Sequence, residues 1–196
     1  MSTVKLTRAE RAGHTRRELL DAAQRLFFSD GYHGTTLDDI ADEAGYTKGA
    51  VYSTFKSKGG LFLALFDEVV DRRVEDIRLL LAPHESNDDK LAALARQPVD
   101  EDNAQFLLLV IEFWVHAARE PALHAAFSER YRRLRTNLAA IAPHGSPFDE
   151  QRWAILTLAF SNGLALERLI DPDGVPDDLM ASVQRQVFGS APAAGG

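Results

Sequence analysis

Residues 36–58 constrain the fold most, because two short helical patterns follow each other there across a break of only a few residues. Thr36 is a favourable N-cap for the first helix, and Asp39 stands three residues later, in the position of a capping box. Gly45 ends that helix, since glycine adopts the left-handed C-cap conformation without a steric penalty. Thr47 is placed to cap the second helix. The apolar residues of the first helix recur at i, i+3, i+4 and i+7, as on one helix face: Leu37, Ile40, Ala41 and Ala44. The stretch therefore predicts a helix-turn-helix.

The second helix of this pair has two chemically different sides. At 100° per residue, Ala50 and Val51 face the first helix, and Phe55 ends the second and returns to the core. The other side carries a cation, an aromatic hydroxyl and small residues, a set suited to a DNA groove and its phosphates. Lys56 and Lys58 surround the next helix N-terminus, where free N–H groups favour phosphate. The predicted DNA contacts are Thr36, Tyr46, Thr47, Lys48, Gly49, Tyr52, Ser53, Lys56 and Lys58.

Spacing alone leaves a second interpretation open, because short helix pairs with a glycine turn also occur in proteins that never bind DNA. The charge distribution helps: residues 1–60 carry nine Lys/Arg and eight Asp/Glu, whereas the remainder carries thirteen and twenty-one. Residues 61–196 are therefore excluded as the DNA-binding surface, because their net negative charge repels the phosphate backbone. The N-terminal cations are equally compatible with a solvated tail and with an arm that contacts phosphates or the minor groove: Lys5, Arg8, Arg11, Arg16 and Arg17.

The composition argues against several other classes of protein. The chain has no cysteine, and its six histidines lack metal-ligand spacing, so we expect no disulfide, metal or cofactor. The longest apolar run, residues 106–111, is too short for a membrane span, and the N-terminus lacks a signal-peptide core. No phosphate loop, nucleophile elbow or zinc motif is present. We therefore expect a cytoplasmic protein that is not an enzyme and has no membrane partner.

The rest of the chain is predicted to be helical as well, with no β pattern. The expected organisation is all-α with about nine helices, a helix-turn-helix head at 1–56 and a helical body at 57–190. The helix 57–81 would start in the head and end in the body. Besides the two helices of the pair, helices are predicted at 15–29, 57–81, 89–96, 103–119, 121–141, 148–170 and 176–188.

Residues 22–62 carry a set of short motifs in a fixed register: Gly31-Tyr32, Thr35-Thr36, Ile40-Ala41, Ala44-Gly45, Gly49, Tyr52 and Phe55. On these motifs the segment resembles the N-terminal domain of the TetR/AcrR family of repressors. The matches keep the family's register over about 40 positions, which is far more specific than a generic helix pair. One departure is Gly59-Gly60, where the family usually has an acidic or helix-favouring residue, and we expect it to loosen the start of the next helix.

The resemblance implies a ligand-responsive transcriptional regulator, usually a repressor, that binds a palindromic operator as a homodimer. In the family the last two helices, here 148–170 and 176–188, pair with their copies in a four-helix bundle. A dimer also has a physical motive, because one recognition helix covers few base pairs and a two-fold dimer reads two half-sites. The alternative function is a helical small-molecule binding protein with a non-functional head; an all-α enzyme has no catalytic constellation behind it.

The resemblance further implies a cavity for a mostly apolar effector in the body. For any single aromatic residue, ordinary core packing is the simpler explanation. Glu112 and His116 lie four apart on a nearly all-apolar helix, so they either hydrogen-bond to each other or recognise a polar group of the effector. The candidate pocket residues are Phe66, Phe106, Val110, Phe113, His116, Phe127, Tyr131, Trp153 and Phe160.

Overall fold

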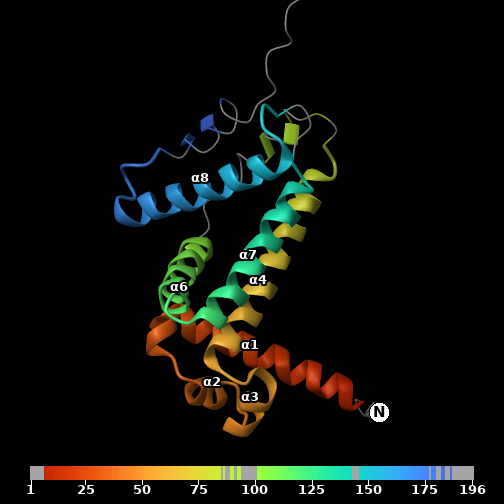
Figure 1. Cartoon of the computed structure of the whole chain (residues 1–196), viewed down its shortest axis with the longest axis vertical. Coiled ribbons are helices and arrows are strands. Elements are labelled where there is room, and N and C mark those ends of the chain that lie inside the picture. The colour runs from red at the N-terminus through yellow and green to blue at the C-terminus, as the bar shows by residue number, and fades with distance from the viewer. Residues whose placement is uncertain are drawn as a thin grey trace, which may run out of the picture. The chain divides into compact units, whose positions relative to one another are not determined.

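The computed structural model describes residues 7–84, 86, 89–90, 92–93, 101–142, 146–176, 178–179, 182–183 and 186, and within them every regular element is a helix. The all-α prediction is confirmed. The expected count of about nine becomes seven helices with described bounds, because the predicted helices 89–96 and 176–188 fall partly outside the described residues. The seven are α1 (Arg8–Gly34), α2 (Leu37–Glu43), α3 (Lys48–Phe55), α4 (Lys58–Leu81), α6 (Glu101–Ala117), α7 (Pro121–Ala139) and α8 (Glu150–Ile170) (Figure 1).

Helix α1 begins seven residues before the position predicted from hydrophobic spacing. Thr7 is its N-cap and closes a capping box with Glu10: the Glu10 N–H donates to the Thr7 hydroxyl at 3.2 Å, and the Thr7 N–H donates to the Glu10 carboxylate at 2.6 Å. The hydrogen bonds from Thr7 lower the pKa of the Glu10 carboxyl. Four of the five N-terminal cations therefore lie on a helix, which corrects the alternative of a solvated tail: Arg8, Arg11, Arg16 and Arg17. Their contact with phosphates or the minor groove stays a prediction.

The chain forms two compact units. The first contains residues 1–69 and 109–124, and the second contains residues 70–108 and 125–196. The first unit thus combines the helix-turn-helix head with the start of α4, the end of α6 and the first residues of α7. The residues of α4, α6 and α7 are divided between the two units.

An aromatic cluster forms the core of the first unit. The rings of Phe62 on α4 and Phe113 on α6 stack with centroids 3.9 Å apart. The Tyr32 ring packs edge-on against both, at 5.7 and 5.3 Å, and Phe27 lies 5.7 Å from Tyr32. All four side chains are buried. Helices α1, α4 and α6 therefore share one core, since each contributes a ring to the same cluster.

The glycine pair at the start of α4 permits close packing, which corrects the expectation that it loosens the helix. Helix α4 is regular from Lys58, and the Ser57 hydroxyl accepts the Gly60 N–H at 3.0 Å as a cap. A Cβ atom on Gly59 would lie 3.0 Å from a methyl carbon of Leu123, and one on Gly60 would lie 2.4 Å from the carbonyl oxygen of Phe55. Any larger residue at position 60 would displace the backbone at the end of α3.

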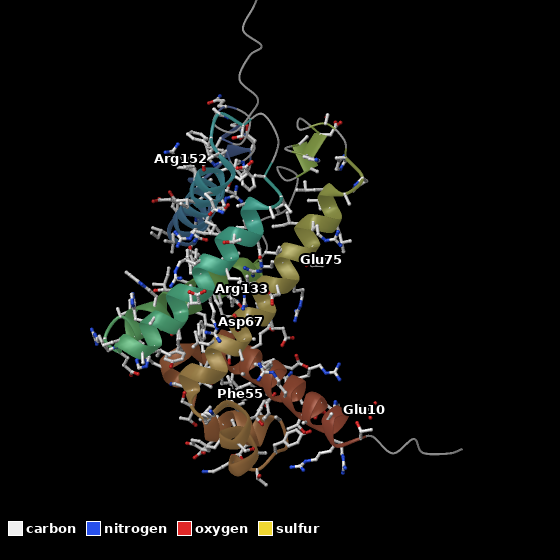
Figure 2. The ribbon with its side chains drawn as sticks, turned by 45° about the vertical axis from the view of Figure 1, so that its right-hand side comes forward. Glu10, Phe55, Asp67, Glu75, Arg133 and Arg152 are labelled. Atoms are coloured by element: carbon white, nitrogen blue, oxygen red, sulfur yellow. The ribbon has the colours of Figure 1, made fainter. Side chains whose placement is uncertain are left out.

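In the second unit, α7 lies alongside α4 and packs against α8 (Figure 1). Arg133 on α7 reaches to 3.9 Å from the carboxylate of Asp71 on α4, and Figure 2 labels Arg133 on the face of α7. Helix α8 is capped by Asp149, whose side chain accepts the Arg152 N–H at 2.8 Å. One buried cluster of this unit contains Leu138, Ala139, Trp153 and Ala154, with Val74, Ile77 and Leu134 among the partly buried residues packed on it.

Helix α8 is more apolar and more exposed than the sequence indicated. By length and composition it is the one helix among the described residues that meets the minimum for a membrane span, although the predicted apolar runs were too short for one. A single such helix is weak evidence, because helices of soluble proteins meet the same criterion. Four large apolar side chains of α8 are exposed: Ile155, Phe160, Leu169 and Ile170.

Candidate DNA-binding surface

Helices α2 and α3 form the helix-turn-helix that the sequence predicts. Thr36 caps α2 in a capping box: its hydroxyl accepts the Asp39 N–H at 3.1 Å, and its own N–H donates to the Asp39 carboxylate at 2.9 Å. The Thr36 hydroxyl also donates to the Asp39 carboxylate at 2.6 Å, and this bond, followed by the one from the Thr36 N–H, lowers the pKa of the Asp39 carboxyl. Gly45 has a φ of 71°, as a left-handed C-cap requires, and the Thr47 hydroxyl accepts the Ala50 N–H at 3.3 Å to cap α3.

The two sides of α3 are as different as predicted. Val51 is fully buried and Phe55 ends the helix in the core, where Figure 2 labels it. The Tyr52 side chain is 52% exposed, so it does not pack in the core. Lys48, Gly49 and Ser53 are exposed on the same helix. Helix α3 therefore presents a cation, an aromatic hydroxyl and small residues outward.

Lys48 is held by a partner on α2. Its ammonium donates to the carboxylate of Asp38, and both side chains are largely exposed. The hydrogen bond from Lys48 to Asp38 raises the pKa of Lys48, so the ammonium stays charged. A DNA phosphate or guanine edge would have to compete with Asp38 for this cation. Sequence analysis did not identify Asp38 as the partner of Lys48, although the two residues lie ten positions apart on either side of the turn.

Tyr46 and Arg16 connect the turn and α3 to α1. The Tyr46 hydroxyl donates to the carboxylate of Glu18 and accepts from the Thr15 hydroxyl at 3.3 Å. The Arg16 guanidinium lies 4.9 Å from the centre of the Phe55 ring. Tyr46 thus has a structural role in the free protein, as do the caps Thr36 and Thr47, and their contact with DNA stays a prediction.

The two lysines around the start of α4 differ. Lys56 is exposed, with a φ of 65°, and its N–H donates to the Tyr52 carbonyl at 3.0 Å, ending α3. Lys58 points inward: its ammonium donates to the carbonyl oxygens of Tyr32 at 2.7 Å and Thr35 at 2.9 Å. Burial lowers the pKa of Lys58, and its ammonium lies 4.5 Å from the centre of the Tyr32 ring. Two of the three ammonium protons of Lys58 are therefore used within the protein.

The predicted pocket residues are divided between the two units. Phe113 is fully buried in the aromatic core of the first unit. In the second unit the Tyr131 hydroxyl accepts a hydrogen bond from Asn162 at 3.3 Å, which brings α7 and α8 together. The cavity stays a prediction. Phe66, Val110, Phe113 and His116 belong to the first unit, and Phe106, Phe127, Tyr131, Trp153 and Phe160 belong to the second.

Glu112 and His116 have different partners, and not each other as one alternative expected. The Glu112 carboxylate accepts the backbone N–H of Tyr32 at 2.7 Å. His116 lies 3.4 Å from the Glu120 carboxylate, with its ring 5.2 Å from that of Tyr32. A carboxylate on an apolar helix signals a polar partner, but the sequence gives no means of finding one 80 residues away.

These features define a helix-turn-helix DNA-binding protein with an all-helical remainder. Residues 19–65 match the family described as bacterial regulatory proteins of the tetR family. Residues 77–188 match the family described as the C-terminal region of BetI-type transcriptional repressors. The chain belongs to the TetR family, and it is a ligand-responsive, DNA-binding transcriptional regulator and not an enzyme. The alternative of a binding protein with a non-functional head is not favoured.

Individual relatives agree over most of the chain. The chain is 29% identical over 209 residues to the transcriptional regulator TtgR of Pseudomonas putida, covering 91% of this chain and 90% of TtgR. It is 30% identical over 185 residues to the regulator CymR of Pseudomonas putida, covering 88% of each. Reduced NemR of E. coli has the same fold, with a TM-score of 0.72 at 18% identity over 92% of this chain and all of NemR. TetR-family regulators bind DNA operators and small-molecule effectors, typically as dimers.

Proposed function

We propose that this chain is a cytoplasmic repressor that binds a palindromic operator as a homodimer and is released by a small, mostly apolar effector. In each subunit α3 enters the major groove of one half-site. The effector binds within the helical body at 57–190 and favours the conformation that does not bind DNA. The head at 1–56 carries the base and phosphate contacts.

One observation carries the assignment of the DNA-reading face: the outward side of α3 is exposed while its inward side is buried. Lys48, Tyr52 and Ser53 stand on the exposed side, and Val51 is fully covered. Gly49 has no atom nearer than 3.9 Å to where a Cβ would stand, so the helix surface there is open to a groove wall. Lys48 suits a guanine edge or a phosphate, and the Tyr52 hydroxyl suits a phosphate.

The phosphate contacts come from residues at the N-terminus of α2 and at both ends of α3. Lys56 is exposed directly after α3 and has no acidic neighbour in the sequence between Glu43 and Asp67. The hydroxyls of Thr36 and Thr47 lie at helix N-termini, where backbone N–H groups favour an anion. Tyr46 supports them from the turn.

The exposed stripe of α8 supports a dimer through that helix and the segment 176–188. Ile155 and Ile170 are exposed at its two ends. Ala159 and Gly163 are exposed between them at i+4 and i+8, and their small size allows a second helix to approach closely. An apolar helix face of this length gains stability when a copy of itself covers it.

The proposal is tested by selecting the genomic DNA fragments that the purified protein retains, followed by footprinting of the enriched sequence. We expect a palindrome whose half-sites lie one helical turn or a multiple apart. Lys48→Ala and Tyr52→Ala should each weaken binding to the enriched fragment about tenfold or more, while sedimentation shows an intact dimer. No enrichment in dilute salt, or unchanged affinity in both variants, contradicts the proposal.

A further inference from the structure

Side chains from α4, from α6 and from the segment itself hydrogen-bond to the connection between α1 and α2. At Gly31 the backbone leaves the helical path, with a φ of 73°, so the residues after it lose part of the helical hydrogen-bond ladder. Tyr32 and Thr35 are both 1% exposed, and buried backbone polar groups need partners. The Thr35 hydroxyl donates to the carbonyls of Leu26 at 3.1 Å and Gly31 at 3.0 Å.

Glu112 supplies one of these partners from α6. Its carboxylate oxygen lies 2.7 Å from the Tyr32 nitrogen, a short distance typical of a charge-assisted bond. A Cβ atom on Gly31 would lie 2.9 and 3.1 Å from the two carboxylate oxygens. Glycine is thus required here twice, for its positive φ and for the approach of Glu112.

Lys58 supplies the opposite partner from α4. Its ammonium binds the carbonyl oxygens of Tyr32 and Thr35. The Tyr32 residue therefore donates its N–H to an anion from α6 and presents its carbonyl to a cation from α4, while its ring is packed among Phe27, Phe62 and Phe113. Helix α2 begins two residues after Thr35.

We propose that Glu112 and Lys58 are positioning residues for DNA binding: they clamp the Tyr32 backbone between α6 and α4 and so fix the point from which α2 and α3 extend. Lys58 then acts within the protein and not as a phosphate contact. This inference rests on the proposed function, because it assigns the two residues a role in placing the DNA-reading helix. Neither residue touches DNA in this role.

The clamp itself is tested without DNA. The chain has four tyrosines, so protein labelled with 15N-tyrosine gives four backbone amide resonances, and Tyr32 is assigned by its loss in Tyr32→Phe. In Glu112→Ala the Tyr32 amide should shift and exchange with solvent about tenfold faster or more, because a charge-assisted bond is lost. Glu112→Gln keeps an acceptor and should retain part of the protection. Glu120→Gln is the matched control, since it removes a nearby carboxylate that binds His116.

The positioning role is tested with the duplex enriched from the genome. Glu112→Ala should weaken binding about tenfold, with Glu112→Gln between it and the wild type. Lys58→Met should weaken binding without changing the dependence of log K on log salt. Lys56→Met is its counterpart on the outside and should reduce that slope by about one, because one phosphate contact is lost. Circular dichroism checks that each variant is folded. If Glu112→Ala does not fold, the inference is tested with Glu112→Gln and Lys58→Met instead.

Three results overturn the inference. The first is a Tyr32 amide in Glu112→Ala that exchanges as in the wild type, and the second is an operator affinity equal to wild type in both Glu112→Ala and Lys58→Met. A reduced salt slope in Lys58→Met also overturns it, because Lys58 is then a phosphate contact. Failure of the proposed function gives a different result: the wild-type protein retains no DNA, while the Tyr32 amide still responds to Glu112→Ala. In that case the clamp exists, but its role in positioning a DNA-binding helix is wrong.

Discussion

Gly60 packs directly against the carbonyl oxygen of Phe55, the last residue of α3, so closely that a Cβ atom at position 60 would lie 2.4 Å from that oxygen. Helix α4 therefore starts in van der Waals contact with the end of the DNA-reading helix. The Ser57 hydroxyl, which caps α4, lies in the same tight turn. The end of α3 and the start of α4 are thus placed together, and a change at one is felt at the other.

Gly60→Ala should destabilise the protein by about 1–3 kcal/mol, because the added methyl group forces the backbone at Phe55 to move. The free energy of unfolding from urea titration measures this. Gly13→Ala is the matched control: no atom lies within 4 Å of its Cβ position on α1, so alanine there should be neutral or stabilising by about 0.5–1 kcal/mol. Equal stability of the two variants would contradict the close contact.

Asp38→Asn should strengthen operator binding about threefold or more, because the carboxylate that holds Lys48 in the free protein is removed. Fluorescence anisotropy with the enriched duplex measures the affinity. Asp42→Asn is the control, because it removes one negative charge near Lys48 without breaking a hydrogen bond to Lys48. Its smaller gain in DNA affinity measures the effect of net charge alone. If Asp38→Asn gains no more than Asp42→Asn, Lys48 is not restrained by Asp38.

One of the four tyrosines should resist ionisation far above its ordinary range. Burial raises the pKa of Tyr32 to about 12, with the Glu120 carboxylate adding to the shift. Because the folded state holds this proton more tightly, the stabilisation is complete below pH 10 and is lost as the pH rises from about 10 towards 12. Ultraviolet titration should show one late phenol, and it should disappear in Tyr32→Phe, whose unfolding free energy falls less steeply over that range.

Ile155→Glu should convert the dimer into a monomer, because a carboxylate on the exposed stripe of α8 has no partner in an apolar helix-helix interface. Sedimentation velocity at micromolar concentration measures the oligomeric state. Leu79→Glu is the control, since Leu79 is also an exposed apolar residue but lies on α4. A dimer that persists in Ile155→Glu would exclude α8 as the interface, and loss of the dimer only in Leu79→Glu would move the interface to α4.

The helix-turn-helix was predictable from the sequence because its signals are local. Thr36, Gly45 and Thr47 act on backbone groups within four residues of themselves, so their types at those positions were sufficient to place α2, the turn and α3. The sidedness of α3 followed from its period. The start of α1 was equally local, in the capping box of Thr7 and Glu10, and was missed because hydrophobic spacing begins later.

The remaining features depend on residues far apart in the chain. Glu112 accepts the Tyr32 N–H across 80 residues, Lys58 donates to the carbonyls of Tyr32 and Thr35, and Gly59 faces Leu123. Whether Lys58 contacts a DNA phosphate stays a prediction. The sequence by itself determined where α2 and α3 begin and end, because caps and helical periods act over one turn. Only the tertiary structure decided which way Lys58 points, which group Glu112 binds and that glycine is needed at the start of α4. These contacts form only when separate helices pack around the same buried backbone.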